Sequence, residues 1–245
     1  MCLVTIHGKT DIGTVRTTNQ DTFAFGEPVG SGCFALVCDG MGGENGGNIA
    51  SQLARDTLIG KITRNMREGM DANSVRNMML TALSGANSMI FEKGQADPTL
   101  SGMGTTVVLA VLLDSTLHLC HVGDSRAYLV RGGSLEQLTR DHSVVQLLIE
   151  QGKITPEQAQ IHPQKNQITR ALGVESEVQV DYNEFDLQKG DKLLLCTDGL
   201  TNSCTEEQIL KLVNANGAKQ ACNKLVSQAN KSGGHDNITA IVIEN

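Results

Sequence analysis

Four aspartates in this sequence stand at the ends of apolar runs that have the composition of β-strands. Asp39, Asp124 and Asp198 each follow such a run, and Asp236 precedes the last one, residues 238–243. Each of the four has a glycine within two residues. In an antiparallel sheet, the end of one strand and the start of its neighbour lie at the same edge. The four carboxylates are therefore predicted to converge.

Convergence of these carboxylates predicts a metal site. An Asp-Gly pair by itself is ordinary turn chemistry, and that interpretation stays open for any one of the four. Gathered in one place, the carboxylates would repel one another and raise one another's pKa values. Mg²⁺ or Mn²⁺, which prefer oxygen ligands, would remove that repulsion. The carbonyl oxygen of Gly40 is a further candidate ligand.

A fifth segment, from Arg16 to Asp21, lies directly before a predicted strand. Arg16 could be a solvated surface charge. Beside a metal cluster, however, its planar guanidinium is suited to hold an oxyanion or a phosphate. Two metals about 3.5–4 Å apart would lower the pKa of a bridging water and clamp both oxygens of an in-line displacement. Such a cluster together with Arg16 would offset the charge of a transferring phosphoryl group.

Other catalytic motifs are missing from the sequence. The glycine-rich stretch 40–47 lacks the Gly-Lys-Ser/Thr of a phosphate-binding loop and does not fit GxGxxG spacing. Neither HExxH nor GxSxG occurs, which argues against the common zinc proteases and serine hydrolases. The spacing Cys-x5-Arg occurs once, from Cys120 to Arg126, but Cys120 lies inside an apolar run that is predicted to be a strand. It is not expected to form a phosphate-binding loop, so a covalent cysteine mechanism is not expected.

Composition sets the broad class of the protein. The chain has 245 residues, with 20 Lys and Arg against 27 Asp and Glu, a net charge of −7. This balance argues against nucleic acid as a partner. The longest apolar run covers only residues 107–113, and no basic-then-apolar segment opens the chain, so membrane insertion and secretion are not expected.

The seven cysteines, Cys2 among them, are odd in number and show no CxxC pair. They are predicted to be reduced, mostly buried thiols of a cytoplasmic protein.

The pattern of apolar residues predicts the elements that position these groups. Strands are expected at 3–7, 22–25, 33–38, 105–112, 117–122, 127–131, 178–185, 192–196 and 238–243. Helices are expected at 75–90, 143–151, 205–213 and 218–230, and another around 49–62 is expected to begin just after the glycines of 40–47. Short turns between neighbouring strands favour antiparallel pairing and a layered α+β fold. Nothing marks a linker, so a single domain over 1–245 is predicted.

These residues, taken in order, resemble the metal-dependent protein phosphatases of type 2C, most of all the compact stand-alone bacterial serine/threonine phosphatases. The resemblance covers about residues 4–243 and depends on the order of the whole motif set. The motifs are Arg16-x-x-Asn19-Gln20-Asp21, Asp39-Gly40-Met41-Gly42-Gly43, Ser101-Gly102-Met103-Gly104-Thr105-Thr106, Gly123-Asp124-Ser125-Arg126, Thr197-Asp198-Gly199 and Gly234-His235-Asp236-Asn237. It implies a central β-sandwich of two antiparallel sheets flanked by helices on both sides, with the metal centre at one edge.

The resemblance also implies roles for individual residues. Asp39 would bridge two Mn²⁺ or Mg²⁺ ions, Asp198 and Asp236 would complete the first site, and the Gly40 carbonyl would join Asp39 on the second. Asp21 would hold the second ion through water.

Two further roles follow from the same resemblance. Asp124, with Asp198, would form a third metal site, and Arg16 would bind the substrate phosphate. The implied reaction is hydrolysis of phosphoserine or phosphothreonine by a water that bridges the two ions. Implied partners are phosphorylated proteins, substrates of a bacterial serine/threonine kinase and the kinase itself, acted on by a monomer.

One position departs from the animal members, which carry a histidine directly after the Asp-Gly pair where this chain has Met41. Protonation of the leaving group must then come from metal-bound water or from another residue, with His235 and His162 as candidates. Residues 140–173 interrupt the apolar pattern. They are expected to form two short helices and a loop, or a flap beside the site that selects substrates.

Two other functions stay open at this stage. A relative that binds phosphopeptides without cleaving them is disfavoured by the intact set of aspartates. A structural Ca²⁺-binding sandwich would have no need of Arg16.

Overall fold

The apolar strands of this chain bury both of their faces. The computed structural model describes residues 4–29 and 32–245. In β3 (Gly32–Met41), Ala35 and Val37 pack into one core while Leu36, between them, packs into another, and all three are fully buried. Successive side chains of a strand point to opposite faces, so a strand covered on both sides reads as an unbroken apolar run.

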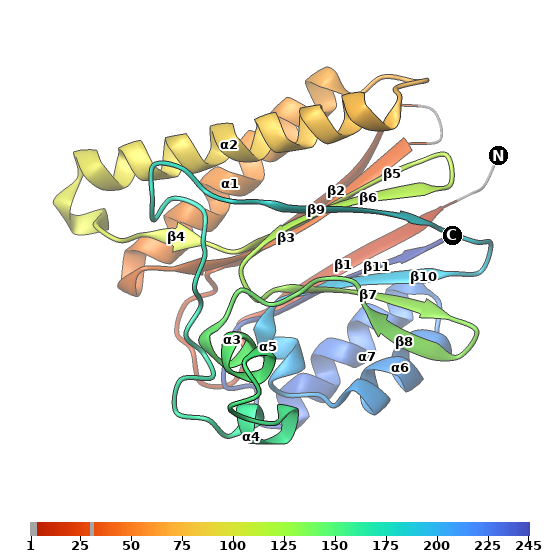
Figure 1. The fold of residues 1–245 in the computed structure, drawn as a ribbon. Helices are drawn as coiled ribbons and strands as arrows, with labels where there is room; N and C mark the ends of the chain where they lie inside the picture. Colours follow the sequence, from red (N-terminus) through yellow and green to blue (C-terminus); the bar gives the residue numbers. More distant parts are fainter. Residues whose placement is uncertain (1–3, 30–31) are drawn as a thin grey trace.

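Two antiparallel sheets face each other across the central core (Figure 1). The first has the order β1-β11-β10-β7-β8 and is built from β1 (Thr5–Asp11), β11 (Ile238–Glu244), β10 (Lys192–Cys196), β7 (Arg126–Arg131) and β8 (Ser134–Gln137). The second has the order β2-β3-β5-β6-β9 and is built from β2 (Asp21–Val29), β3, β5 (Val107–Leu113), β6 (Thr116–Val122) and β9 (Asp181–Asp186). The short strand β4 (Gly104–Thr105) pairs with the end of β3.

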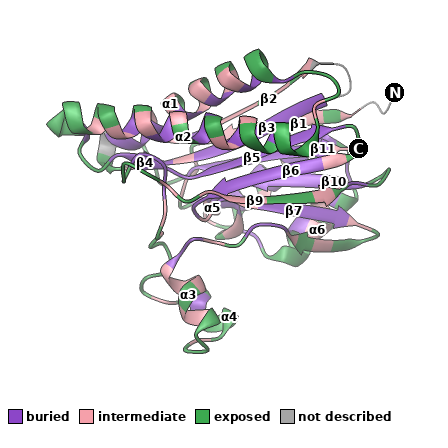
Figure 2. Cartoon of the chain, turned by 45° about the horizontal axis from the view of Figure 1, so that its top comes forward, coloured by how far each residue is buried: buried purple, intermediate pink, exposed green. Residues whose placement is uncertain are grey.

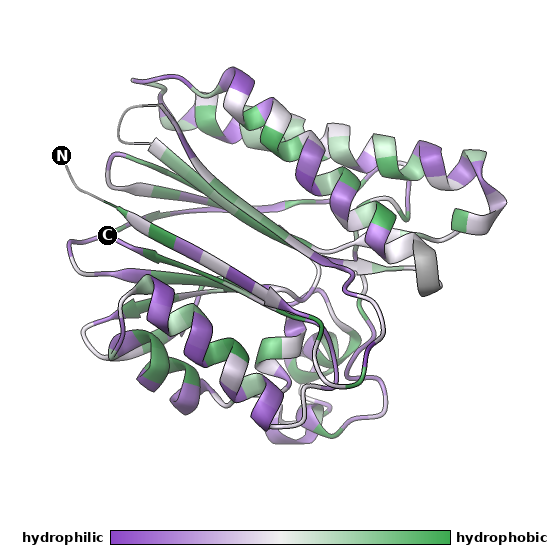
Figure 3. Ribbon diagram, turned by 180° about the vertical axis from the view of Figure 1, so that it is seen from behind, coloured by the Kyte–Doolittle hydropathy of each residue, from purple (hydrophilic) through white to green (hydrophobic). Residues whose placement is uncertain are grey.

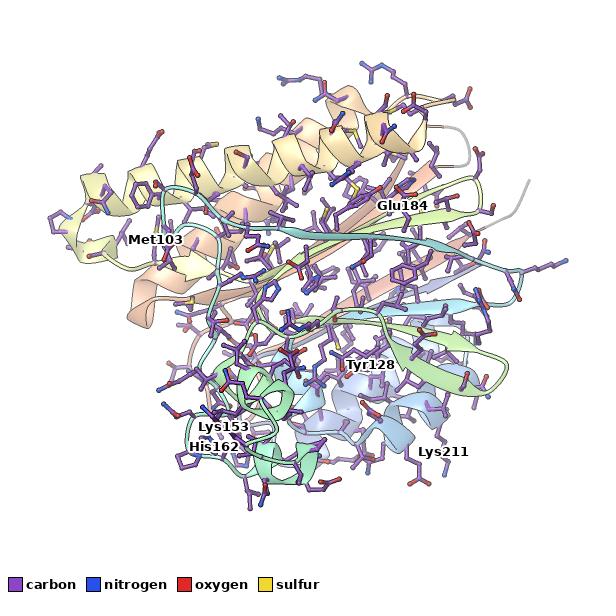
Figure 4. All side chains as sticks on the ribbon, viewed as in Figure 1. Met103, Tyr128, Lys153, His162, Glu184 and Lys211 are labelled. Atoms are coloured by element: carbon purple, nitrogen blue, oxygen red, sulfur yellow. The ribbon has the colours of Figure 1, made fainter. Side chains whose placement is uncertain are left out.

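Helices cover the outer face of each sheet. The second sheet is covered by α1 (Gly43–Asn65) and α2 (Ala72–Ala96), and the first by α6 (Glu206–Asn214) and α7 (Ala218–Lys231). Figure 3 shows these helices with apolar residues toward the sheets and polar residues outward. Tyr128, labelled in Figure 4, is buried between the first sheet and its helices. The α+β sandwich with helices on both sides is therefore confirmed.

Three short helices and one 3-10 turn lie in the connections: α3 (Val144–Glu150), α4 (Pro156–Gln160), α5 (Asp198–Thr201) and the turn at Pro98–Leu100. The segment with α3 and α4 extends away from the sheets and is largely exposed (Figure 2). Residues 140–173 thus contain two short helices and loops, as expected. No helix within the described residues combines the length and apolar character needed to cross a bilayer.

Several predicted boundaries were wrong. The predicted strand 178–185 begins only at β9, because its ladder with β6 ends where His121 pairs with Asp181. The run at 105–112 is split at Thr106 into β4 and β5. The polar strand β8 was missed, since it has no apolar run. The start of the run at 3–7 lies outside the described residues, as does Cys2.

The glycines of 40–47 also behave differently from the prediction, because α1 begins at Gly43, among them. A Cβ atom on Gly47 would lie 2.6 Å from the backbone of Gly40, and one on Gly40 would lie 2.0 Å from the carbonyl oxygen of Gly47. The first turns of the helix can contact the end of β3 only where neither residue has a side chain.

The cysteines that the structure describes are free and buried. Burial raises the pKa of the Cys204 thiol to about 11. These thiols are packed in the cores and are protonated at neutral pH, as the sequence predicted for buried cysteines.

Candidate active site

Asp21 and Asp39 lie opposite each other in the β2–β3 ladder. The sequence suggested that Asp39 ends its strand, but the strand continues beyond it. Gly40 and Met41 continue β3 because they pair with Thr105 and Gly104 of β4. The backbone of Asp39 is fixed on both sides: its N–H donates to Thr106 Oγ1 at 3.0 Å, and its carbonyl accepts the Thr106 N–H at 2.9 Å.

The Asp21 carboxylate is buried and only half satisfied. Its Oδ2 accepts hydrogen bonds of 2.7 Å from the hydroxyls of both Thr197 and Thr239. Its Oδ1 is buried without a hydrogen-bond partner in the described structure. Burial, followed by repulsion from Asp198 and Asp236, raises the pKa of Asp21 to about 7, although the two threonine hydrogen bonds oppose the shift.

Asp198 is the first residue of α5 and has the same kind of half-satisfied carboxylate. Its Oδ2 accepts from Asn202 Nδ2 at 2.9 Å, while its buried Oδ1 has no partner in the part of the chain described here. Burial, and then the charge of Asp236, raises its pKa above the usual range. A buried acceptor without a donor is uncommon and is typical of a position where a cation or a water binds.

Asp39 and Asp124 belong to the same cluster. Burial raises the pKa of Asp39 well above its usual range, and Asp21, Asp198, Asp124 and Asp236 add to the shift by repulsion. Asp124 lies in the loop between β6 and β7, and its pKa is likewise raised well above the usual range by burial and then by Asp198.

Arg16 supplies the positive charge at this edge. Its Nη2 donates to Asp236 Oδ2 at 2.8 Å, and its side chain is 53% exposed. The pKa of Arg16 is raised by that hydrogen bond first, with further contributions from Asp39 and Asp198. The guanidinium therefore stands at the open side of the carboxylates, where an incoming anion would arrive.

The residues predicted from the sequence thus meet at one edge of the two sheets: Arg16, Asp21, Asp39, Gly40, Asp124, Asp198 and Asp236. Their individual roles as ligands and as a phosphate-binding group remain predictions. The donor set fits divalent cations, because it consists of carboxylate oxygens and one carbonyl in a group whose charges repel. Two of the carboxylate oxygens have no hydrogen-bond partner in the described part of the chain.

Asn237, for which the sequence predicted no role, organises the loop that carries Arg16. Its Oδ1 accepts the Gln20 N–H at 2.8 Å, and its Nδ2 donates to the carbonyls of Ile12 and Thr18 at 3.0 Å. Three hydrogen bonds from one buried side chain hold the β1–β2 loop against the start of β11. Only its position directly after Asp236 could have suggested this role.

A second group, which the sequence did not indicate, joins the flap segment to the Asp124 loop. His142 Nδ1 accepts the Gly123 N–H at 3.1 Å, and the His142 N–H donates to the Gly123 carbonyl at 2.9 Å. The proton of the neutral ring therefore lies on Nε2, 3.3 Å from Asp181 Oδ2. Burial, followed by the neighbouring His121, lowers the pKa of His142 to about 4.

His121, His142 and Asp181 place one possible ligand atom each within 4.8 Å of one another, but they do not suit a metal ion. The two imidazole rings are stacked, with centroids 4.7 Å apart and planes inclined by only 19°. A ring nitrogen binds a metal in the plane of its ring, so two nearly parallel rings do not point at one ion. Arg170, which donates to Asp181 Oδ1 at 2.8 Å, already supplies positive charge there. His142, Asp181 and Arg170 form a polar brace, and the ring of His121 stacks on it.

The two histidines considered as general acids lie in different surroundings. His235 is exposed in the turn before β11. His162, labelled in Figure 4, lies two residues after α4 and accepts the Gln164 N–H at 3.2 Å through Nδ1. The choice between them and other acids stays open.

The same fold occurs in solved serine/threonine phosphatases. The serine/threonine phosphatase of S. agalactiae superposes with a TM-score of 0.92 at 35% identity, covering 98% of this chain and 99% of that one. The catalytic domain of the phosphatase PstP, solved in complex with two manganese ions, superposes with a TM-score of 0.85 at 32% identity over 98% and 97% of the two chains.

The sequence matches the protein phosphatase 2C family over residues 13–241, and the chain belongs to this family. The protein phosphatase PhpP of Streptococcus pneumoniae is 38% identical over 236 residues, which cover 96% of this chain and 94% of PhpP. The predicted family and the predicted enzyme class, a protein serine/threonine phosphatase, are thereby confirmed.

Proposed function

We propose that this chain hydrolyses phosphoserine and phosphothreonine in proteins with the help of two Mn²⁺ or Mg²⁺ ions. The observation that carries this proposal is the largely buried aspartate cluster, beside which Arg16 stands. In it, Asp21 Oδ1 and Asp198 Oδ1 have no hydrogen-bond partner among the residues that the structure describes. A protein retains repelling, poorly satisfied carboxylates mainly where a cation binds them.

The resident ions would be held by Asp39, the Gly40 carbonyl, Asp198 and Asp236, with Asp21 acting through water. When bound, they would supply an activated water as nucleophile and neutralise charge on the phosphoryl oxygens. The S. agalactiae protein and PhpP are named as phosphatases, and PstP was solved with two manganese ions. These likenesses support the assignment of the ions to this chain.

Arg16 would bind the phosphate of the substrate. Its 2.8 Å hydrogen bond with Asp236 is partly exposed and hence easily exchanged. Once Asp236 faces a cation, the guanidinium can turn its paired N–H groups to two phosphate oxygens. Asp124 with Asp198 would hold a third ion.

We further propose that residues 1–245 form one catalytic domain that works as a monomer, with 140–173 as its flap. The physiological partners would be phosphoproteins made by a serine/threonine kinase, and the kinase itself. The free, buried cysteines of the described chain support a reducing compartment, the cytoplasm.

The test is phosphate release from a phosphothreonine peptide with added Mn²⁺ and then with excess EDTA. We expect release that requires Mn²⁺. The Asp39→Asn variant, purified in parallel, should lose at least about a thousandfold in kcat while its circular dichroism spectrum is retained. Equal activity of the variant would overturn the role of Asp39. Mn²⁺ binding without any release would favour the phosphopeptide-binding alternative.

A further inference from the structure

A cavity of about 290 Å³ lies beside the catalytic edge, between Met41 and the segment that returns from the flap to β9. Figure 1 shows this segment, in teal, rising past β4 toward α2 before it enters β9. Met41 is bonded directly to Gly40, so the cavity begins two residues from Asp39. An extended peptide advances about 3.3 Å per residue, so it can reach such a neighbouring cavity within a few positions.

Half of the residues that line the cavity are apolar. They are Met41, Ile168, Ala171, Val174 and Val178. Val174 is 43% exposed, so a ligand in the cavity can contact its methyl groups. The volume is just below the usual range for small-molecule pockets, about 300–1,000 Å³, and so suits one or two amino-acid side chains better than a cofactor.

The rim of the cavity is acidic. Glu175 and Glu177 line it together with Arg170. The guanidinium of Arg170 is already paired with Asp181 at 2.8 Å. Ion pairs to Glu175 and Glu177 are not found within residues 4–29 and 32–245. The charge left for a ligand is therefore negative, which favours a basic group.

The far wall is fixed in advance by a buried side chain of α2. Asn87 Oδ1 accepts the Gly173 N–H at 2.7 Å, and Asn87 Nδ2 donates to the carbonyls of Glu175 and Ser176 at 3.0 and 3.1 Å. Gly173 has φ +87 and packs so closely on Ile90 that a Cβ atom would lie 2.1 Å from its side chain. This wall is built on a rigid helix and needs little ordering on binding.

The near wall is tied to the catalytic strand. Thr105 of β4 exchanges two backbone hydrogen bonds with Leu172, at 2.9 and 3.1 Å, while β4 also pairs with Gly40 and Met41. Met103, labelled in Figure 4, lies just before β4 at this end of the molecule. The cavity thus has the same backbone frame as the site of hydrolysis.

We infer that this cavity is a substrate subsite that accepts an apolar side chain of the phosphoprotein, followed by a lysine or arginine that faces Glu175 and Glu177. This inference rests on the proposed phosphatase activity and specifies which sequences around the phosphorylated residue are cleaved best. Met41 acts here as an apolar wall between the metal centre and the subsite.

The test compares p-nitrophenyl phosphate, which is too small to reach the cavity, with phosphothreonine peptides. A Leu-Lys pair is moved one position at a time through an alanine background, from five residues before the phosphothreonine to five after. Matched peptides carry Leu-Glu or Asp-Lys at the same places. We expect one position at which Leu-Lys raises kcat/KM about tenfold over alanine, with a smaller gain for either mismatched pair.

Two variants assign the preference to this cavity. Val174→Asp should lower the ratio of kcat/KM for the Leu-Lys peptide to that for p-nitrophenyl phosphate by about tenfold. Glu177→Lys should change the preference from Leu-Lys toward Leu-Glu. Glu68→Lys makes the same charge change in the turn after α1. This helix is about 33 Å long and begins beside the catalytic edge, so Glu68 lies at its far end, and the variant should keep the wild-type preference.

The outcomes separate the subsite from the activity itself. Hydrolysis of p-nitrophenyl phosphate with equal kcat/KM for all peptides would overturn the subsite and leave the phosphatase assignment intact. A preference for Leu-Glu, or one that Glu68→Lys changes as much as Glu177→Lys does, would also overturn it. Failure to hydrolyse any substrate with Mn²⁺ would refute the phosphatase proposal and this inference with it.

Discussion

Arg16 and Asp236, 220 residues apart in sequence, are joined by a 2.8 Å hydrogen bond at the open edge of the aspartate cluster. The two side chains are 53% and 34% exposed. An ion pair this accessible contributes little to stability. Its position beside the carboxylates is consistent with the proposed roles, in which Asp236 would bind a cation and Arg16 would bind the phosphate of the substrate.

Replacing Arg16 by alanine should therefore affect substrate binding first. We expect Arg16→Ala to raise KM about tenfold while kcat falls less, because a charge-assisted contact to phosphate is lost. Steady-state kinetics on a phosphothreonine peptide measure both constants. Arg64→Ala, an exposed arginine in the last turn of α1, is the matched control. An unchanged KM in Arg16→Ala would contradict the phosphate-binding role.

Asn237→Ala should loosen the loop that carries Arg16. The variant loses the three hydrogen bonds to Gln20, Ile12 and Thr18, and we expect a loss of about 1–3 kcal/mol in unfolding free energy together with a higher KM. Urea unfolding and kinetics measure the two effects. Asn183→Ala, at an exposed position of β9, should change neither. A variant that loses stability but keeps its KM would show that Asn237 does not position Arg16.

Asp124→Ala tests the proposed third metal site. Removal of this carboxylate should lower the number of bound Mn²⁺ ions by one in calorimetric titration, and hydrolysis of protein substrates should fall. Without metal, the variant should unfold at a higher temperature than the wild type. The reason is that burial and Asp198 raise the pKa of Asp124 well above its usual range, so its charge destabilises the metal-free fold. Unchanged Mn²⁺ stoichiometry would argue against a third site.

The metal-free protein should lose stability as the pH rises. The pKa of Asp21 is raised from 3.8 to about 7 in the fold, so between these values the folded state binds more protons than the unfolded one. The unfolding free energy should then fall progressively from about pH 4 to pH 7, by at most about 4 kcal/mol for this group.

Thermal unfolding in EDTA across this pH range measures the effect, and Asp21→Asn should flatten the curve. Added Mn²⁺ favours the ionised carboxylates, so its stabilising effect should grow with pH. A metal-free unfolding temperature that rises from pH 5 to pH 8 would contradict this account.

Much of the fold could be predicted from the sequence because strands that are buried on both faces consist of unbroken apolar runs. The central strand at 192–196 matches β10 at both ends. The prediction failed where pairing partners, rather than composition, set the limits, as at residues 178–180, or where a strand is polar, as in β8. The start of α1 was misplaced because glycine is read locally as a helix breaker, whereas Gly47 is needed for contact with Gly40.

The candidate site divides in the same way. The sequence by itself determined that aspartates and glycines stand beside apolar runs, because such neighbours are local features of the chain. Only the tertiary structure decided that Asp21 faces Asp39, that Asn237 fastens the Arg16 loop, and that His142 braces the Asp124 loop. Each of these contacts joins segments that are distant in the chain or depends on the direction of a side chain. Such contacts arise when the two sheets close on a common core, and no local pattern of residues encodes them.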